Sequence, residues 1–139
     1  MIDCRHAGPQ DVALLAQMNR DLIRDEGHRN PMTLAELEER MAGWLQGEYE
    51  AVIFAQDGDA AGYALYRRSP EYVYLRHFYV RPECRRRGIG RAALAWLRQN
   101  TWRDVRRVRV DVLVHNATGI AFWRAVGFSD YALTLEMDL

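Results

Sequence analysis

Apolar residues recur every three or four positions in several stretches of the chain, which is the spacing that places them on one face of a helix. The helices predicted from this pattern cover residues 12–22, 34–45, 89–102 and 117–125. Thr33 followed by Glu36 fits a capping box at the start of the second helix, and Gly47 ends that helix.

Other stretches are short and rich in β-branched and aromatic residues, which is typical of strands. The strands predicted from them cover residues 2–5, 51–55, 62–66, 72–80, 108–114 and 131–137. In the stretch 108–114 four valines alternate with Arg109, Asp111 and Leu113, as expected of a strand with one buried face. Helix-linked strands combined with three consecutive strands predict an α/β (α+β) domain with a mixed sheet.

The composition fits a single globular domain over residues 1–139. Of the 139 residues, 49% are hydrophobic and 27% are charged, and no apolar run approaches the roughly 18 residues that cross a membrane. The first residues lack the apolar stretch of a signal peptide. We therefore expect a cytoplasmic protein in which Cys4 and Cys84 are reduced.

The net charge is zero, but the two halves of the chain differ. Residues 1–66 hold 5 Arg and 12 Asp or Glu, whereas residues 67–139 hold 14 Arg and 7 Asp or Glu. All 19 basic residues are Arg. An anionic ligand is expected on the second half, and the acidic first half suits a cationic group. The neutral net charge and the lack of a recognition motif argue against a nucleic-acid partner.

The most informative segment is residues 80–91, where a predicted strand leads through an arginine-rich loop into a helix that two glycines open. Gly88 and Gly90 allow close approach of a ligand, and the helix N-terminus offers free N–H groups to an anion such as a pyrophosphate. A Walker loop is excluded because the chain has no Lys. A dinucleotide-binding fold would use Asp111 as the ribose-binding acid, but it requires a strand that turns directly into the first glycine, and here the arginine-rich loop intervenes. The remaining alternative is an ordinary solvated loop before the helix.

With these residues in view, the chain resembles the GNAT superfamily of acetyl-CoA-dependent N-acetyltransferases. Residues 85–90 (Arg-Arg-Arg-Gly-Ile-Gly) match the family's Arg/Gln-x-x-Gly-x-Gly/Ala motif, between a strand that ends in Phe78-Tyr79-Val80 and a helix. Asn116 and residues 122–128 (Phe-Trp-Arg-Ala-Val-Gly-Phe) resemble the family's downstream pattern. The specific resemblance covers residues 72–128, and residues 1–71 match in element order.

The resemblance implies a largely antiparallel mixed sheet of about six or seven strands flanked by four helices. It also implies that strands 72–80 and 108–114 splay apart to hold acetyl-CoA, with no metal. The implied cofactor-binding residues are Phe78, Tyr79, Val80, Arg85, Arg86, Arg87, Gly88, Ile89, Gly90, Arg91, Asn116 and Trp123. A backbone N–H near Tyr79 or Val80 would stabilise the negative charge that develops on the acetyl oxygen.

In this family the amine attacks the thioester directly, so a base or a water chain must first remove a proton from the amine. The candidate bases are His77, Tyr74, Glu26 and His28. Many members place a Tyr where this chain has Trp123, as acid for the departing thiolate. An indole cannot act as a practical acid, so solvent or Tyr79 is expected to replace it, and Trp123 to pack against the cofactor.

The acceptor is expected to be a primary amine of a small molecule. Polyamine acetyltransferases carry acidic residues where Arg76 and His77 stand, so Arg76 favours a zwitterionic or amino-acid-like acceptor, with Glu26 and His28 also at the acceptor site. Two alternatives are a CoA-binding sensor without turnover and a protein N-terminal or lysine acetyltransferase. No membrane partner is expected, and a homodimer could form through the predicted strand 131–137.

Overall fold

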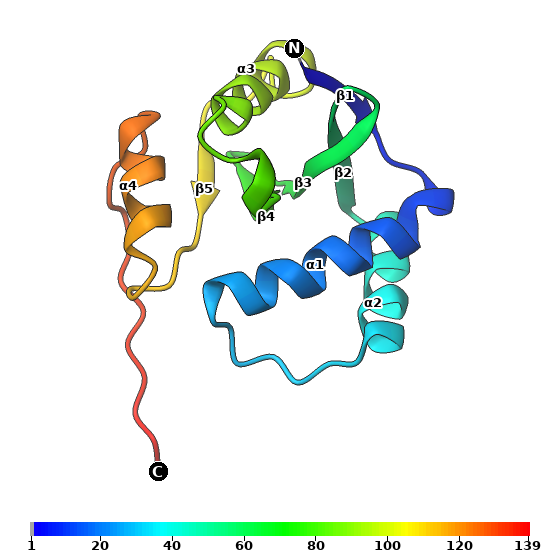
Figure 1. Ribbon diagram of the computed structural model, residues 1–139. Coiled ribbons are helices and arrows are strands. Elements are labelled where there is room, and N and C mark those ends of the chain that lie inside the picture. Colours follow the sequence, from blue (N-terminus) through cyan, green and yellow to red (C-terminus); the bar gives the residue numbers. More distant parts are fainter. Residues whose placement is uncertain (1) are drawn as a thin grey trace.

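Five strands form one mixed sheet in the computed structural model, which describes residues 2–139 (Figure 1). The elements are β1 (Ile2–His6), α1 (Val12–Glu26), α2 (Leu34–Gln46), β2 (Tyr49–Gln56), β3 (Asp59–Arg68), β4 (Val73–Val80), α3 (Ile89–Asn100), β5 (Val108–Val110) and α4 (Ala117–Ala125). Short 3-10 turns at Pro9–Asp11 and Pro82–Cys84 precede α1 and α3. The mixed α/β class predicted from the sequence is confirmed, with fewer strands than the six or seven expected.

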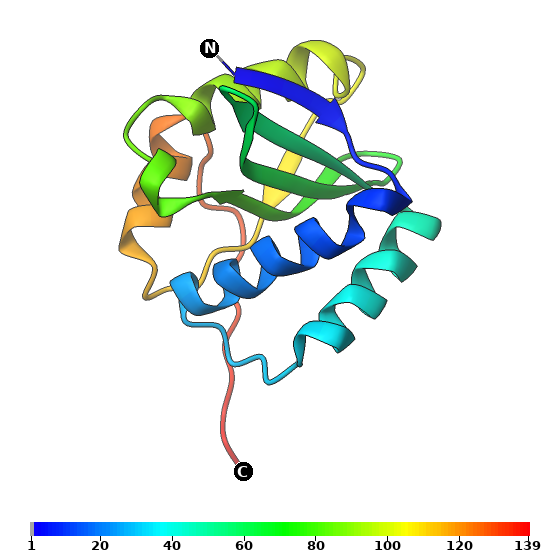
Figure 2. The same cartoon turned by 45° about the vertical axis from the view of Figure 1, so that its right-hand side comes forward.

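Helices cover both faces of the sheet (Figure 2). The apolar faces of α1 and α2 pack on one side, where Leu15, Met18 and Met41 meet Ile53 and Leu65. On the opposite side α3 packs its own apolar face over a second cluster. That cluster includes Val52, Phe54, Tyr66, Val73, Leu75, Ala93, Leu94 and Leu97. Burial of each large side chain contributes roughly 1.5–3 kcal/mol, so both helical layers hold the sheet in place.

Strand β5 leaves one edge of β4 uncovered. β1 to β4 are antiparallel neighbours, while β5 runs parallel to β4 and pairs only through Val73–Leu75 with Val108–Val110. β4 continues to Val80, so its second half has no strand on the β5 side. The predicted splay between these strands is confirmed, and the prediction that the second strand extends to Val114 is wrong.

A β-bulge explains why the two strands separate. Leu65 of β3 pairs with His77 and the next residue, Tyr66, pairs with Leu75, so Arg76 is an extra residue in β4. A bulge bends its strand and increases the local twist. It lies directly after the last β4–β5 pair, Leu75 with Val110, and therefore turns the second half of β4 away from β5.

The predicted strand 131–137 is also wrong. The segment is extended and has no backbone pairing of a strand (Figure 1). It contacts the rest of the chain through side chains, where Tyr131 lies against Arg109 of β5 and Glu136 pairs with Arg29. Its alternating apolar side chains are 72–82% exposed; they are Tyr131, Leu133, Leu135 and Met137. Alternation gives a segment the character of a strand, but a strand forms only where a neighbour supplies hydrogen bonds.

Within residues 2–139, none of the helices combines the length and the apolar character that a membrane crossing requires.

Candidate active site

The N-terminus of α3 presents free backbone donors. Gly88 lies in the left-handed region at φ 75°, and Arg86 does so at φ 64°. The first helical bond runs from the N–H of Ala92 to the carbonyl of Gly88 at 3.0 Å, so the preceding amides of residues 89–91 lack helical partners. The Ile89 side chain is 2% exposed and belongs to the core, so this residue offers a ligand only its backbone. Three amides and the positive end of a helix suit an anion.

Gly90 is required for a different reason. A methyl group built on it would lie 3.0 Å from the ring of Phe122, which belongs to α4. The glycine therefore allows α4 to pack closely against the start of α3. At Gly88, by contrast, a methyl group would meet no atom within 4 Å, so the space outside the loop is open.

The arginines of the loop divide into two groups. Arg85 holds the loop in place, because its Nε donates to the Val80 carbonyl at 2.8 Å and its guanidinium pairs with Asp25 of α1 at 2.7 Å. Arg86, Arg87 and Arg91 are exposed and have no carboxylate within 4.0 Å among residues 2–139. Their charge is therefore available to an anion at the helix N-terminus.

Aromatic rings line the gap between β4 and α4. Phe78 of β4 stacks on Phe122 with ring centroids 6.0 Å apart and meets the edge of Trp123 at 5.3 Å. Trp123 also packs against Phe128 at 5.0 Å. This cluster gives the gap an apolar wall, and Trp123 forms part of both this wall and the adjoining cavity.

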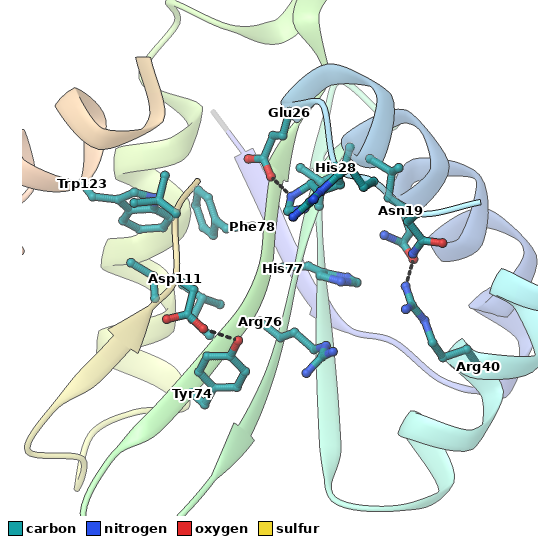
Figure 3. Close-up of a pocket in the computed structure, with 17 residues that line it drawn as sticks. Asn19, Glu26, His28, Arg40, Tyr74, Arg76, His77, Phe78, Asp111 and Trp123 are labelled. Carbon is teal, nitrogen blue, oxygen red and sulfur yellow. Dashed lines mark hydrogen bonds and ion pairs between the residues drawn. The ribbon is translucent and has the colours of Figure 1, made fainter. Parts of the chain in front are cut away.

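A cavity of about 280 Å³ lies between the C-terminal end of α1, the loop after it, α2 and the splayed strands (Figure 3). Its lining is rich in charged and polar side chains. They are Asn19, Glu26, His28, Arg29, Asn30, Arg40, Tyr74, Arg76, His77 and Asp111. The cavity therefore brings together residues from both halves of the chain and from both sides of the bulge.

His77 is held in a setting that opposes protonation. Its Nδ1 is 3.0 Å from the Tyr63 hydroxyl, and its ring meets Trp44 edge-on at 5.4 Å. Burial of the ring and the charges of Arg40 and Arg76 lower the pKa of His77 to about 3. A group with so low a pKa is a weak base near neutral pH, so the geometry does not favour His77 as the group that deprotonates an amine.

The two tyrosine candidates differ in position. Tyr74 lines the cavity, its hydroxyl donates to Asp111 at 2.8 Å, and burial together with that carboxylate raises its pKa to about 12. Tyr79 is 3% exposed, packs in the α1–α2 layer and does not line the cavity. Burial raises its pKa as well. Tyr74 is thus a hydrogen-bond donor within the cavity, while only the backbone of Tyr79 borders the gap.

Glu26 links the two sides of the splay. One oxygen lies 2.8 Å from His28 Nε2, and the other accepts from the Asn116 amide at 3.4 Å. The Asn116 side-chain oxygen in turn accepts from the Gly119 N–H at 3.0 Å and caps α4. Asn116 therefore holds the start of α4 against the end of α1.

The sequence profile of the Acetyltransferase (GNAT) family matches residues 14–128, a span that contains the α3 loop, the gap and the cavity. The chain belongs to the GNAT family and is an acyltransferase. It is 31% identical over 140 residues to aminoglycoside N(6')-acetyltransferase type 1 of Stenotrophomonas maltophilia, with 91% of this chain and 85% of that protein covered.

Solved structures of other acetyltransferases share the fold. An acetyltransferase from Clostridium acetobutylicum with acetyl-CoA superposes with a TM-score of 0.77 at 20% identity, over 99% of this chain and 96% of that one. Aminoglycoside N-acetyltransferase AAC(6')-Iy in complex with CoA gives a TM-score of 0.79 at 19% identity, over 100% and 95% of the two chains.

Within this GNAT fold, one cavity is lined by all five residues that the sequence predicts as bases or for the acceptor site: Glu26, His28, Tyr74, Arg76 and His77. The same cavity is also lined by Asn19, Arg40 and Asp111, which the sequence does not predict for an acceptor site. Asn19 and Arg40 lie on helical faces whose pattern resembles that of any amphipathic helix, so no signal in the sequence could single them out. Asp111 was considered only as the acid of a dinucleotide fold. Among residues 2–139, no cluster of three or more metal-ligating side chains is present.

Proposed function

We propose that this chain is an N-acetyltransferase that moves an acetyl group from acetyl-CoA to a primary amine of a small molecule, by direct attack within a ternary complex. The observation that carries the proposal is the continuity of three features: an anion-binding helix start, an uncovered β4 edge and a charged cavity at the splay. Together they accommodate a pyrophosphate, an extended amide-bearing arm and an amine.

The residues present fit acetyl-CoA, whose thioester supplies the acetyl group and whose CoA thiol is the leaving group. The free amides of residues 89–91, with Arg86, Arg87 and Arg91, bind the pyrophosphate. Arg85 supports this loop through Asp25 and contributes less directly. The uncovered edge of β4 over Phe78–Val80 pairs with the amides of the pantetheine arm as an added strand would, and Trp123 packs against that arm.

The cavity then holds the amine. The carboxylates of Glu26 and Asp111 attract an ammonium group, and the Glu26–His28 pair accepts its proton before attack. A backbone N–H near Tyr79 or Val80 stabilises the charge that develops on the carbonyl oxygen. No protein nucleophile is involved, so Cys84 has no chemical part in the reaction.

Two alternative functions of the same fold can be distinguished from this proposal. A CoA-binding sensor without turnover has Trp123 as its support, and release of CoA with any amine would exclude it. A protein N-terminal or lysine acetyltransferase requires an open groove for a peptide, whereas a cavity of about 280 Å³ suits a small molecule.

The cofactor site is tested by the melting temperature with and without acetyl-CoA. A ligand at 100 times its Kd stabilises the folded state by about 2.7 kcal/mol, so the melting temperature of the wild type should rise with acetyl-CoA concentration. Gly88→Glu should abolish the rise, because the added charge faces the pyrophosphate in open space. Gly88→Gln has the same backbone strain without the charge and should retain a rise. An unchanged melting temperature of the wild type at millimolar acetyl-CoA would contradict the proposal.

The exposed segment 131–137 supports a homodimer in which this segment pairs with a second copy of the chain. Among the described residues, β5 pairs with one strand, β4, so the backbone groups of its other edge lack a strand partner, although Tyr131 lies against Arg109. Light scattering on the full chain should give the mass of a dimer, and Leu133→Asp or Leu135→Asp should give a monomer. Thr134→Asp, on the polar side of the same alternation, should leave the dimer intact. A monomeric wild type would contradict this part of the proposal.

A further inference from the structure

Two arginines in the cavity have no counter-charge within the described part of the chain. Arg40 of α2 and Arg76 at the β4 bulge both lie over Trp44, with Cζ atoms 4.4 Å and 4.9 Å from its ring centroid. Among residues 2–139, neither has a carboxylate within 4.0 Å. A third cavity arginine, Arg29, differs because it pairs with Glu136 at 2.7 Å.

The surroundings of this pair contain further unused donors. Arg40 donates to the side-chain oxygen of Asn19 at 3.1 Å, while its own Nε is buried without a partner. Asn19 is 1% exposed, and its Nδ2 is also buried without a partner. Buried donors that lack an acceptor, beside two like charges, are costly in free energy unless a ligand supplies the missing acceptor. Burial and the charge of Arg76 lower the pKa of Arg40, consistent with that cost.

The acidic groups of the cavity lie elsewhere. Figure 3 shows Tyr74 and Asp111 on the side of β5, and Asn19, Arg40 and the head of Arg76 on the side of α2. Glu26 stands at the end of α1, where it contacts Asn116 at the start of α4. The cavity therefore has a negative side next to the gap and a positive side away from it.

We propose that Arg40, Arg76 and Asn19 form a subsite for an anionic group of the acceptor, so that the substrate is a small zwitterion with a primary amine at one end and a carboxylate at the other. This inference rests on the proposed acetyl transfer. Guanidinium groups bind carboxylates through paired hydrogen bonds, and the Asn19 amide adds a neutral donor. This side of the cavity repels polycations. They include the aminoglycosides, which appear in the names of the relatives.

The experiment measures CoA release at saturating acetyl-CoA with matched pairs of acceptors. The first set is glycine, β-alanine, 4-aminobutyrate and 6-aminohexanoate, the second is their carboxamides, and the third is the aminoalkylphosphonates of the same lengths. Spermidine and neamine are the polycations. For the chain length that bridges the cavity, the carboxylate should exceed its carboxamide in kcat/KM by about tenfold to a hundredfold. The phosphonates show whether the subsite prefers a carboxylate or a phosphate-like group.

The variants Arg40→Gln and Arg76→Gln should each reduce the ratio of kcat/KM between carboxylate and carboxamide about tenfold or more. The reduction should come from the KM of the carboxylate rather than from kcat, while the kcat/KM of the carboxamides changes little. Arg98→Gln removes an exposed charge of α3 outside the cavity and is the matched control, with the preference retained. An equal kcat/KM for carboxylates and carboxamides, or faster turnover of spermidine or neamine, would overturn the subsite and leave acetyl transfer intact.

Binding separates the subsite from the chemistry. Both guanidinium groups lie over the ring of Trp44, so its fluorescence should respond when 4-aminobutyrate or 6-aminohexanoate binds. The response should be weaker with the carboxamides and in Arg76→Gln. If no acceptor is acetylated, the proposed acetyl transfer is refuted, but the titration still tests whether the subsite binds a carboxylate. No difference between carboxylate and carboxamide in the titration would overturn it.

Discussion

His77 leads to a measurable prediction about stability and pH. The groups that face its ring are the Tyr63 hydroxyl of β3, the charges of Arg40 and Arg76, and His28 from the loop after α1. Burial and the nearby positive charges lower the pKa of His77 from 6.5 to about 3. The folded state therefore keeps this imidazole neutral under conditions that protonate it in the unfolded chain.

The sign and the size follow from proton linkage. Between pH 6.5 and about 3 the unfolded chain binds a proton that the folded chain does not, so the free energy of unfolding falls as the pH is lowered. From pH 7 to pH 5 the loss attributable to His77 is about 2 kcal/mol, since one pKa unit corresponds to about 1.4 kcal/mol.

Urea unfolding at pH 7 and pH 5 of the wild type and His77→Asn isolates this contribution. Asn keeps a polar atom near the position of Nδ1, which preserves a partner for Tyr63 and removes the titration. The wild type should lose about 2 kcal/mol more than the variant on acidification. Because the other histidines are common to both proteins, their effects cancel. Equal losses in the two proteins would refute the reasoning and restore His77 as a candidate base.

Three further predictions concern local structure. Gly88→Ala should destabilise the fold by about 1 kcal/mol in urea unfolding, because a side chain at φ 75° is strained where nothing else obstructs it. Thr33→Ala should lose about 1 kcal/mol by the same measurement, whereas Thr33→Ser should lose little, since Thr33 exchanges capping bonds with Glu36. The bonds from Arg5 lower the pKa of the buried Asp11, so this carboxylate stabilises the fold above pH 3.8 and progressively less below it. Asp11→Asn should therefore cost about 1–2 kcal/mol at pH 7, with a smaller difference from the wild type at pH 3, measured by thermal unfolding.

Elements whose signals are local could be predicted from the order of residues alone. Helical spacing and the Thr33–Glu36 capping box predicted α2, which begins at Leu34 as expected. The two glycines and the arginines around them predicted an anion site at the start of α3, because positive φ and free N–H groups depend on neighbours in the chain. The order of these elements was sufficient for the fold class.

The place where the strands separate and the set of residues that line the cavity depend on contacts between segments far apart in the chain. The bulge at Arg76 moves the residues that follow it to the opposite face of β4. The bulge arises from the pairing of β4 with β3, and the alternation of residues within β4 gives no sign of it. The meeting of Arg40 with Arg76 depends on how α2 packs against the sheet. The segment 131–137 has the alternation of a strand but does not form one, because strand formation requires backbone hydrogen bonds and this segment contacts Arg109 and Arg29 through side chains.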